Sequence, residues 1–90
     1  MPTTVFDRVR HIFVDLLGVH EDQVQLTTSF EDLNVDSLDL VEIVIRIEDE
    51  FAGEHEGAGK QFEISDEQAK GIRTVRDTVE YLKSRGIQDR

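Results

Sequence analysis

Apolar residues recur at helical spacing near the start of the chain. Between residues 3 and 17 they fall every three or four positions, which is the period of an amphipathic helix. These apolar positions are Val5, Val9, Ile12, Phe13, Leu16 and Leu17. Thr3 or Thr4 can cap the start of this helix and Gly18 can end it. We therefore predict a first helix over residues 3–17.

A second helix is predicted over residues 37–51, with Asp36 as its N-cap and Asp39 in its first turn. Its apolar residues form two stripes. One stripe fits an arc of about 100°, wide enough for a core-facing surface: Leu40, Ile43, Val44, Ile47 and Phe51. The other stripe follows i, i+3, i+7 spacing: Leu38, Val41 and Ile45. Either the helix is buried nearly all round, or this second stripe is partly exposed as a docking strip.

Two further helices are predicted in the C-terminal part. A short one starts at Ser65, where Gln68 completes a possible capping box, and ends at Gly71. The last helix runs over about 74–85, before Gly86. The apolar positions assigned to its inner face and to the residue before it are Val75, Val79, Leu82 and Ile72.

Two connections differ in composition. Residues 19–35 are predicted to form a long, mostly extended loop that is pinned down by spaced apolar anchors. These anchors are Val24, Leu26, Phe30 and Leu33. Residues 52–61 are Gly-rich and polar, which predicts a flexible surface loop. The expected fold is all-α, a small bundle of three main helices plus one short helix, in a single domain over residues 1–90.

The net charge and its distribution along the chain indicate which classes of binding partner the protein favours. The formal net charge is -10, from 20 acids against 10 Lys and Arg. Such a surface disfavours nucleic acid and favours basic protein surfaces. Between Arg10 and Arg46 there is no Lys or Arg. The basic residues gather late in the chain: Lys70, Arg73, Arg76, Lys83, Arg85 and Arg90.

The chain has no cysteine, which excludes disulfides, thiolate metal sites and a protein thiol nucleophile. Any thiol chemistry would need a thiol from a cofactor. It also lacks a long apolar run and a signal-peptide pattern. We therefore expect a cytoplasmic protein with no membrane span, and a monomer. The three histidines, His11, His20 and His55, have no spacing typical of a triad or a metal site.

Residues 32–42 carry the candidate chemistry. They read D-L-N-V-D-S-L-D-L-V-E and resemble the signature of acyl carrier proteins, roughly D-L-G-x-D-S-L-D followed by an apolar and acidic helix. The resemblance continues through 47–51, 63–67 and 74–82. It also includes the first helix and residues 28–30, so it covers nearly the whole chain.

This resemblance implies a carrier rather than an enzyme. In the family, a phosphopantetheinyl transferase moves 4'-phosphopantetheine from coenzyme A onto the motif serine, here Ser37. Asp36 would hold the serine region and help orient the metal used by the transferase, and Leu38 would anchor the docking surface. The implied partners are that transferase and acyl-transferring or acyl-modifying enzymes of fatty-acid, lipid or secondary-metabolite synthesis, with basic docking surfaces. The expected docking residues are Leu38, Asp39, Val41, Glu42, Ile45, Glu48 and Asp49.

The chain departs from the family pattern at three places. Asn34 replaces the common glycine before the motif, and Asn tolerates a left-handed conformation. Arg46 places a cation on an acidic helix. The connection 52–61 is longer than usual by several residues. Together these features indicate a specialised carrier.

Other interpretations of the motif are open at this point. Ser37 after Asp36 could be ordinary helix capping, and the chain could be an acidic interaction module without a prosthetic group. A carrier of amino acids, of the D-alanyl or aminoacyl type, shares the same design. Asp32, Asn34 and Asp36 match positions 1, 3 and 5 of a calcium-binding EF-hand loop. That pattern then fails, because Ser37 stands where Gly is needed and Ile43 where Glu is needed, so we expect no specific metal site.

Overall fold

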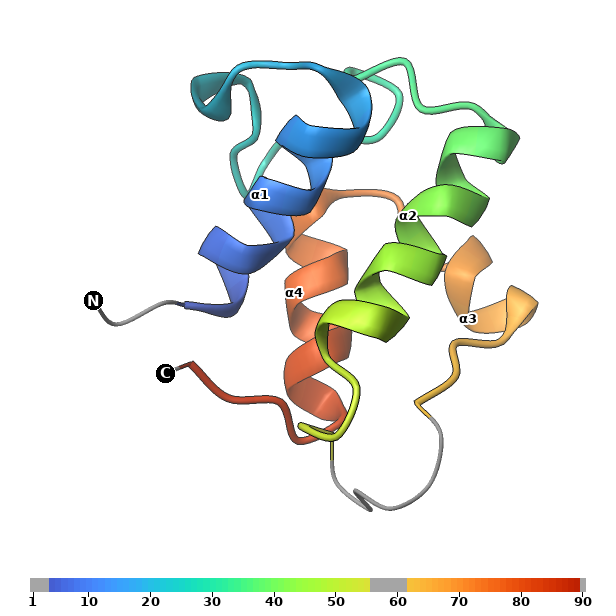
Figure 1. The fold of residues 1–90 in the computed structure, drawn as a ribbon. Coiled ribbons are helices and arrows are strands. Elements are labelled where there is room, and N and C mark those ends of the chain that lie inside the picture. The colour runs from blue at the N-terminus through green and yellow to red at the C-terminus, as the bar shows by residue number, and fades with distance from the viewer. Residues whose placement is uncertain (1–3, 56–61, 90) are drawn as a thin grey trace.

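The computed structural model describes residues 4–55 and 62–89. Its elements confirm the all-α prediction (Figure 1). They are α1 (Val5–Leu17), the 3₁₀ helix η1 (Glu21–Gln23), α2 (Ser37–Glu50), the short α3 (Asp66–Lys70) and α4 (Val75–Ser84). Within the described residues, extended pairing is limited to one isolated bridge between Ser29 and Thr74.

Side-chain caps fix the helix ends close to where the sequence predicts them. The Thr4 hydroxyl accepts a hydrogen bond of 3.0 Å from the Asp7 amide, which satisfies a backbone donor that the first turn leaves free. Gly18 ends α1 with a left-handed φ of 69°. The predicted capping box between Ser65 and Gln68 is present at the start of α3. These local signals explain why the boundaries differ from the predictions by only one or two residues.

The core lies where α1 packs against both α2 and α4. One stripe of α2 faces it, with Ile43 and Ile47 almost fully buried. From the loop after α1, Phe30 reaches the same core, and its ring lies 5.4 Å from that of Phe13, centroid to centroid. Burial of these side chains is the main stabilising contribution in a chain of this size.

The loop after α1 is pinned down, as predicted, but it is not extended. Its anchors Val24, Phe30 and Leu33 are buried, whereas Leu26 is 37% exposed and does not act as an anchor. The prediction of a mostly extended segment is wrong because local turns form instead: η1, and a series of turns over residues 30–34. These turns satisfy part of the loop's backbone within the loop itself, for example by hydrogen bonds from Thr28 N to Gln25 O and from Leu33 N to Phe30 O.

Backbone hydrogen bonds fasten this loop to the start of α4. Three of them cross between the two segments, at 2.9, 3.0 and 3.1 Å: Phe30 N to Arg73 O, Val75 N to Thr28 O, and Arg76 N to Leu26 O. The residues that precede α2 are therefore held by the C-terminal part of the chain.

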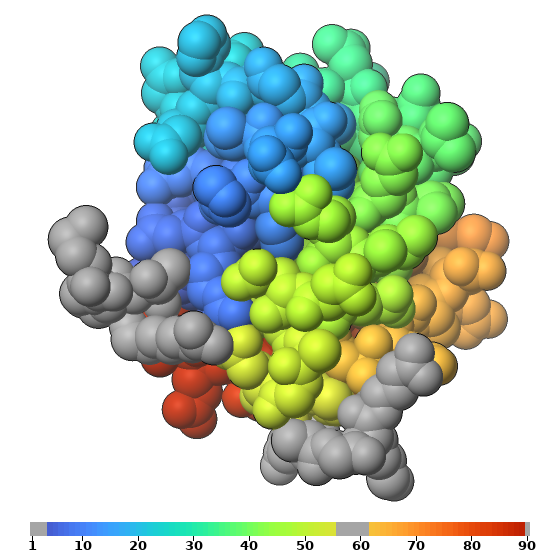
Figure 2. Space-filling model, in the orientation of Figure 1, coloured from blue at the N-terminus to red at the C-terminus, as the bar shows by residue number. Residues whose placement is uncertain are grey.

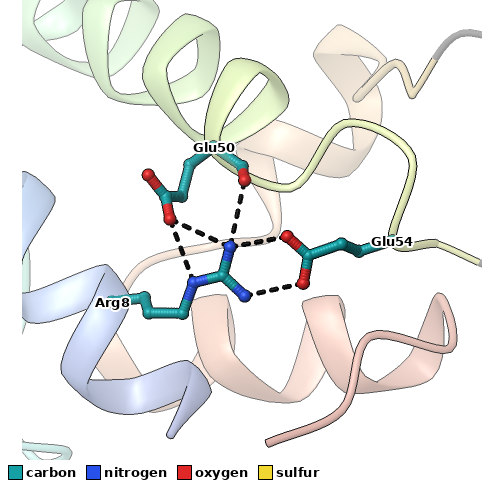
Figure 3. A network of polar contacts seen from close by, with 3 residues as sticks. All are labelled: Arg8, Glu50 and Glu54. Atoms are coloured by element: carbon teal, nitrogen blue, oxygen red, sulfur yellow. Dashed lines mark hydrogen bonds and ion pairs between the residues drawn. The ribbon is translucent and has the colours of Figure 1, made fainter. Parts of the chain in front are cut away.

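A buried arginine joins the first helix to the turn after α2 (Figure 3). The guanidinium of Arg8 donates to both carboxylate oxygens of Glu54, at 2.7 and 2.6 Å. It also donates to the carboxylate of Glu50 at 3.0 Å and to the Glu50 carbonyl at 3.1 Å. We call Arg8, Glu50 and Glu54 the Arg8 network. The arginine also lies 4.3 Å above the centre of the Phe51 ring.

The predicted flexible loop, residues 52–61, falls partly outside the described residues. Its described part, 52–55, forms a turn that is held at two points. Glu54 belongs to the Arg8 network, and His55 is buried and stacks on Phe62 with ring centroids 4.9 Å apart. Residues 56–61 lie outside the described part. Across the residues that can be described, no helix is both long and apolar enough to cross a membrane.

Candidate functional site

Ser37 is the first residue of α2 and is exposed. Across the described chain, its hydroxyl has no hydrogen-bond partner. The amides of Ser37 and Leu38 belong to the first turn, where no intrahelical acceptor exists. An exposed hydroxyl therefore stands beside free amide hydrogens at the positive end of the helix dipole, a setting that stabilises an attached anion.

Asp36 fixes the backbone next to Ser37 by capping the start of α2. Its carboxylate accepts a hydrogen bond of 2.8 Å from the Asp39 amide, and the Asp39 carboxylate accepts one of 3.3 Å from the Asp36 amide. This reciprocal capping box fixes the start of α2. It uses one Asp36 oxygen, Oδ1, so the other points to no partner within the described residues.

The turn before the motif uses the left-handed conformation that the sequence indicated. Asn34 has a φ of 57°, and among the described residues it is the one non-glycine with a positive φ. The turn is closed by hydrogen bonds from Asn34 N to Glu31 O at 3.0 Å and from Val35 N to Phe30 O at 2.9 Å. Asparagine therefore adopts here the left-handed conformation for which glycine is ordinarily used.

The carboxylates of the EF-hand-like pattern act as caps. Asp32 accepts from the Ser29 amide at 3.1 Å, and Asp36 accepts from the Asp39 amide. Among the residues that the structure describes, no group of three acidic or histidine side chains is placed to hold a metal ion. His11 and His20 are exposed, whereas His55 is buried.

The second apolar stripe of α2 is exposed, which decides between the two interpretations of this helix. Leu38, Val41 and Ile45 are 70%, 54% and 50% exposed, against 1% and 2% for Ile43 and Ile47. The green outer surface of α2 in Figure 2 borders the orange surface of α3. Unpaired apolar side chains of this size on one helix face are typical of an interaction site.

The acids predicted to surround this stripe have different settings. Glu42 and Asp49 are exposed, and Asp39 belongs to the capping box. Glu48 accepts a hydrogen bond of 2.8 Å from the Ile64 amide, so it also fastens the segment before α3 to α2. Arg46, whose role the sequence left open, forms an ion pair of 2.9 Å with Asp15 and so links α2 to α1.

Two grooves open at Ser37. The α2–α3 groove has a volume of about 360 Å³ and is lined by Ser37, Leu40, Val41, Val44, Ile45, Glu48, Ile64, Asp66, Ala69 and Lys70. The second, which we call the loop groove, has about 540 Å³ and lies between the segment before α2 and the segment joining α3 to α4. Its lining is Ser29, Phe30, Glu31, Val35, Asp36, Ser37, Leu40, Ala69, Lys70, Ile72, Arg73 and Thr74.

These features fit a phosphate-linked arm at Ser37: an unengaged hydroxyl, free amides and open space on two sides. The fold and the site together define a small helical carrier domain. Comparison with protein-family models matches residues 7–82 to the phosphopantetheine attachment site family. The chain therefore belongs to this family, whose members carry covalently attached 4'-phosphopantetheine, and it is a carrier protein of the acyl-carrier type.

The sequence missed two aspects of the site. It did not place Lys70 and Arg73 in a groove wall next to Ser37. The one available signal was the late clustering of basic residues, which says nothing about where they fold back. It also did not reveal the Arg8 network, because its members come from two distant parts of the chain.

Proposed function

We propose that Ser37 is the phosphopantetheine attachment residue and that the protein carries acyl intermediates as thioesters on this arm. The observation that supports the proposal best is the position of Ser37 at the start of α2, where its side chain is exposed and has no hydrogen-bond partner among residues 4–55 and 62–89. The arm ends in a thiol, which a cysteine-free chain cannot otherwise supply. On this proposal the protein serves enzymes of fatty-acid, lipid or secondary-metabolite synthesis.

The attachment step replaces the pyrophosphate bond of coenzyme A by a phosphate ester at Ser37. The Ser37 oxygen bonds to the phosphorus that bears the pantetheine in coenzyme A. The bond from that phosphorus to adenosine 3',5'-bisphosphate breaks, and the hydroxyl proton passes to a base of the transferase. The free amides at the start of α2 stabilise the resulting phosphodiester. The free oxygen of Asp36 is placed to help orient the metal ion that the transferase brings.

The exposed stripe of α2 supplies the docking surface of the proposed carrier. Leu38, Val41 and Ile45 provide a small apolar centre, and acids such as Glu42 and Asp49 surround it. Such an arrangement selects partners with an apolar pocket and a basic rim, and charge attraction speeds their encounter. The transferase and the acyl-transferring and acyl-modifying enzymes would share this surface.

The lining of the α2–α3 groove favours an acyl cargo over an amino-acid cargo. The groove starts at Ser37 and its wall includes Val41, Val44, Ile45 and Ile64. An apolar chain can leave water by lying against these side chains. These apolar side chains outnumber the two acids of the same wall, Glu48 and Asp66.

Mass spectrometry tests the attachment residue. Apo protein incubated with coenzyme A, magnesium and a broad-specificity transferase should gain one phosphopantetheine, about 340 Da. Ser37→Ala should gain nothing. Ser84→Ala is the matched control, because Ser84 is an exposed serine at the end of α4, and it should be modified like the parent. Full modification of Ser37→Ala would refute the assignment.

A further inference from the structure

The cations that the structure describes differ in their partners, and one of them, Arg85, forms no ion pair but donates hydrogen bonds to the Tyr81 hydroxyl and the Glu63 carbonyl. Four of them form ion pairs with acids in the described part of the chain: Arg8, Arg10, Arg46 and Lys83. Three others, exposed and also described, form none: Lys70, Arg73 and Arg76. Acids are abundant, with 20 in the chain, so the unpaired state of these three side chains calls for an explanation other than a shortage of partners.

Two of the three unpaired cations line the loop groove at Ser37. Lys70 lies at the end of α3 and Arg73 in the connection to α4, and both contribute to the wall opposite the start of α2. Arg76, the second residue of α4, does not line this groove. Lys70 also borders the α2–α3 groove, where Glu48 and Asp66 place acids in the wall. The loop groove also has two acids in its wall, Glu31 and Asp36. It has two cations against the single lysine of the α2–α3 groove, so it is the less acidic of the two grooves next to Ser37.

We propose that Lys70 and Arg73 form an anion subsite that holds the phosphodiester root of the arm, so that the arm turns into the loop groove. The proposal rests on attachment at Ser37. Lys and Arg are the side chains best suited to a phosphate oxygen, as a point charge and as a planar fork of donors. Their attraction adds to that of the free amides at the start of α2.

The remaining lining of the loop groove suits the part of the arm next to the phosphate. That part is a pantoyl unit with two methyl groups on one carbon, followed by an amide. Phe30, Val35 and Ile72 offer apolar contacts for the methyl groups. Ser29 and Thr74 line the same groove and offer polar groups near the amide.

In holo protein without a cargo, an arm held in the loop groove leaves the α2 stripe uncovered. Leu38, Val41 and Ile45 then stay available to a partner while the arm waits on the other side of Ser37. Because the subsite is open to solvent, its hold on the arm weakens as salt screens the charges. A partner with a basic surface can therefore compete for the phosphate and draw the arm out.

Backbone amide NMR spectra of apo and holo protein test this subsite. The variants are Lys70→Gln, Arg73→Gln and the double variant, with Arg76→Gln as the matched control that removes an unpaired cation outside the groove. Each holo sample is first shown by mass to carry one arm. Absence of modification would contradict the proposed function, whereas the spectra report only on where an attached arm lies.

In the parent, arm-dependent shifts are expected at Val35, Ile72 and Thr74, which line the loop groove and not the α2–α3 groove, with contacts from the pantoyl methyl groups to Phe30 or Ile72. The double variant should lose about half or more of these shifts, as should the parent in high salt, and Arg76→Gln should keep them. Shifts running along Val41, Ile45 and Glu48 instead would overturn the proposal. So would shifts that survive in the double variant, or that fall equally in Arg76→Gln. Unchanged apo spectra away from the substituted sites establish that each variant is folded.

Discussion

The Arg8 guanidinium donates two parallel hydrogen bonds to the Glu54 carboxylate, although the two residues lie 46 positions apart in the sequence. The pair joins α1 to the turn that follows α2. Its arginine is buried, with 7% of the side chain exposed, while the Glu54 side chain is 24% exposed. The hydrogen bond to Glu54 raises the pKa of Arg8 above its usual value. The stabilisation that this pair gives the fold is fully present below the usual pKa of arginine. It is lost only when the pH rises through the raised pKa of Arg8.

Removing Arg8 should destabilise the fold. Arg8→Met keeps much of the length of the side chain but leaves the carboxylates of Glu50 and Glu54 without their partner, at a cost of about 2 kcal/mol. Urea denaturation measures this loss. Arg10→Met is the control, since Arg10 forms an exposed i,i+3 pair with Asp7 worth only about 0.5 kcal/mol. Equal midpoints for the two variants would show that the Arg8 network contributes little.

The left-handed residue before the motif gives a second prediction. Asn34→Gly should leave stability nearly unchanged, because glycine adopts a φ of 57° without strain. Asn34→Ala should cost about 1 kcal/mol and should loosen the start of α2. Thermal melting compares the two variants, and the initial rate of modification at Ser37 reports on the motif. An alanine variant as stable as the glycine variant would contradict this account of the turn.

Neighbouring isoleucines on α2 should separate docking from stability. Ile45→Ala should weaken binding to the phosphopantetheinyl transferase with little loss of stability, because Ile45 is half exposed. Ile43→Ala, at a buried position, should instead cost about 3 kcal/mol of stability. Leu38→Ala should behave like Ile45→Ala. A loss of cooperative unfolding in Ile45→Ala would place that side chain in the core.

A charge reversal on the same surface tests the role of its acids. Glu42→Lys should slow association with the transferase and reduce the dependence of the association rate on salt. Stopped-flow measurements at several ionic strengths give both quantities. An association rate that is insensitive to salt in the parent would mean that the acids do not steer this encounter.

Divalent cations should stabilise the acidic half of the chain. It holds eight acids between Arg10 and Arg46, and of these only Asp15 forms an ion pair within the described residues. Magnesium or calcium should raise the melting temperature more than sodium at equal ionic strength, saturating at millimolar concentration. Calorimetry provides the check. Tight, stoichiometric calcium binding would instead indicate a specific site of the EF-hand kind around Asp32.

The fold followed from the sequence wherever the controlling signals were local. The capping residues and the 3.6-residue period set the helices, and the two stripes of α2 were separable by angle alone. The sequence left open whether Leu38 is exposed or buried, because the apolar pattern of a helix does not say how many other elements pack around that helix. The turns of the loop after α1 escaped prediction, since the sequence shows its anchors but not the short-range hydrogen bonds between them.

For the candidate site, the motif predicted the setting of Ser37, since capping by Asp36 and the exposed start of a helix are local properties. The loop groove was not predictable in the same way. Its walls come from the segments before α2 and after α3, and they meet only once the chain has folded. The same holds for Glu48, whose bond to the Ile64 amide depends on where α3 packs.

The three backbone bonds between the loop and the start of α4 have a consequence for the order of events in the cell. They join segments far apart in the sequence, so they form after most of the chain has been synthesised and has collapsed. Until then the turn that presents Ser37 is held only by its own short-range hydrogen bonds. If Ser37 is the attachment residue, we therefore expect a nascent or partly unfolded chain to be a poor substrate for modification, so that the arm is attached mainly to molecules that have completed their fold.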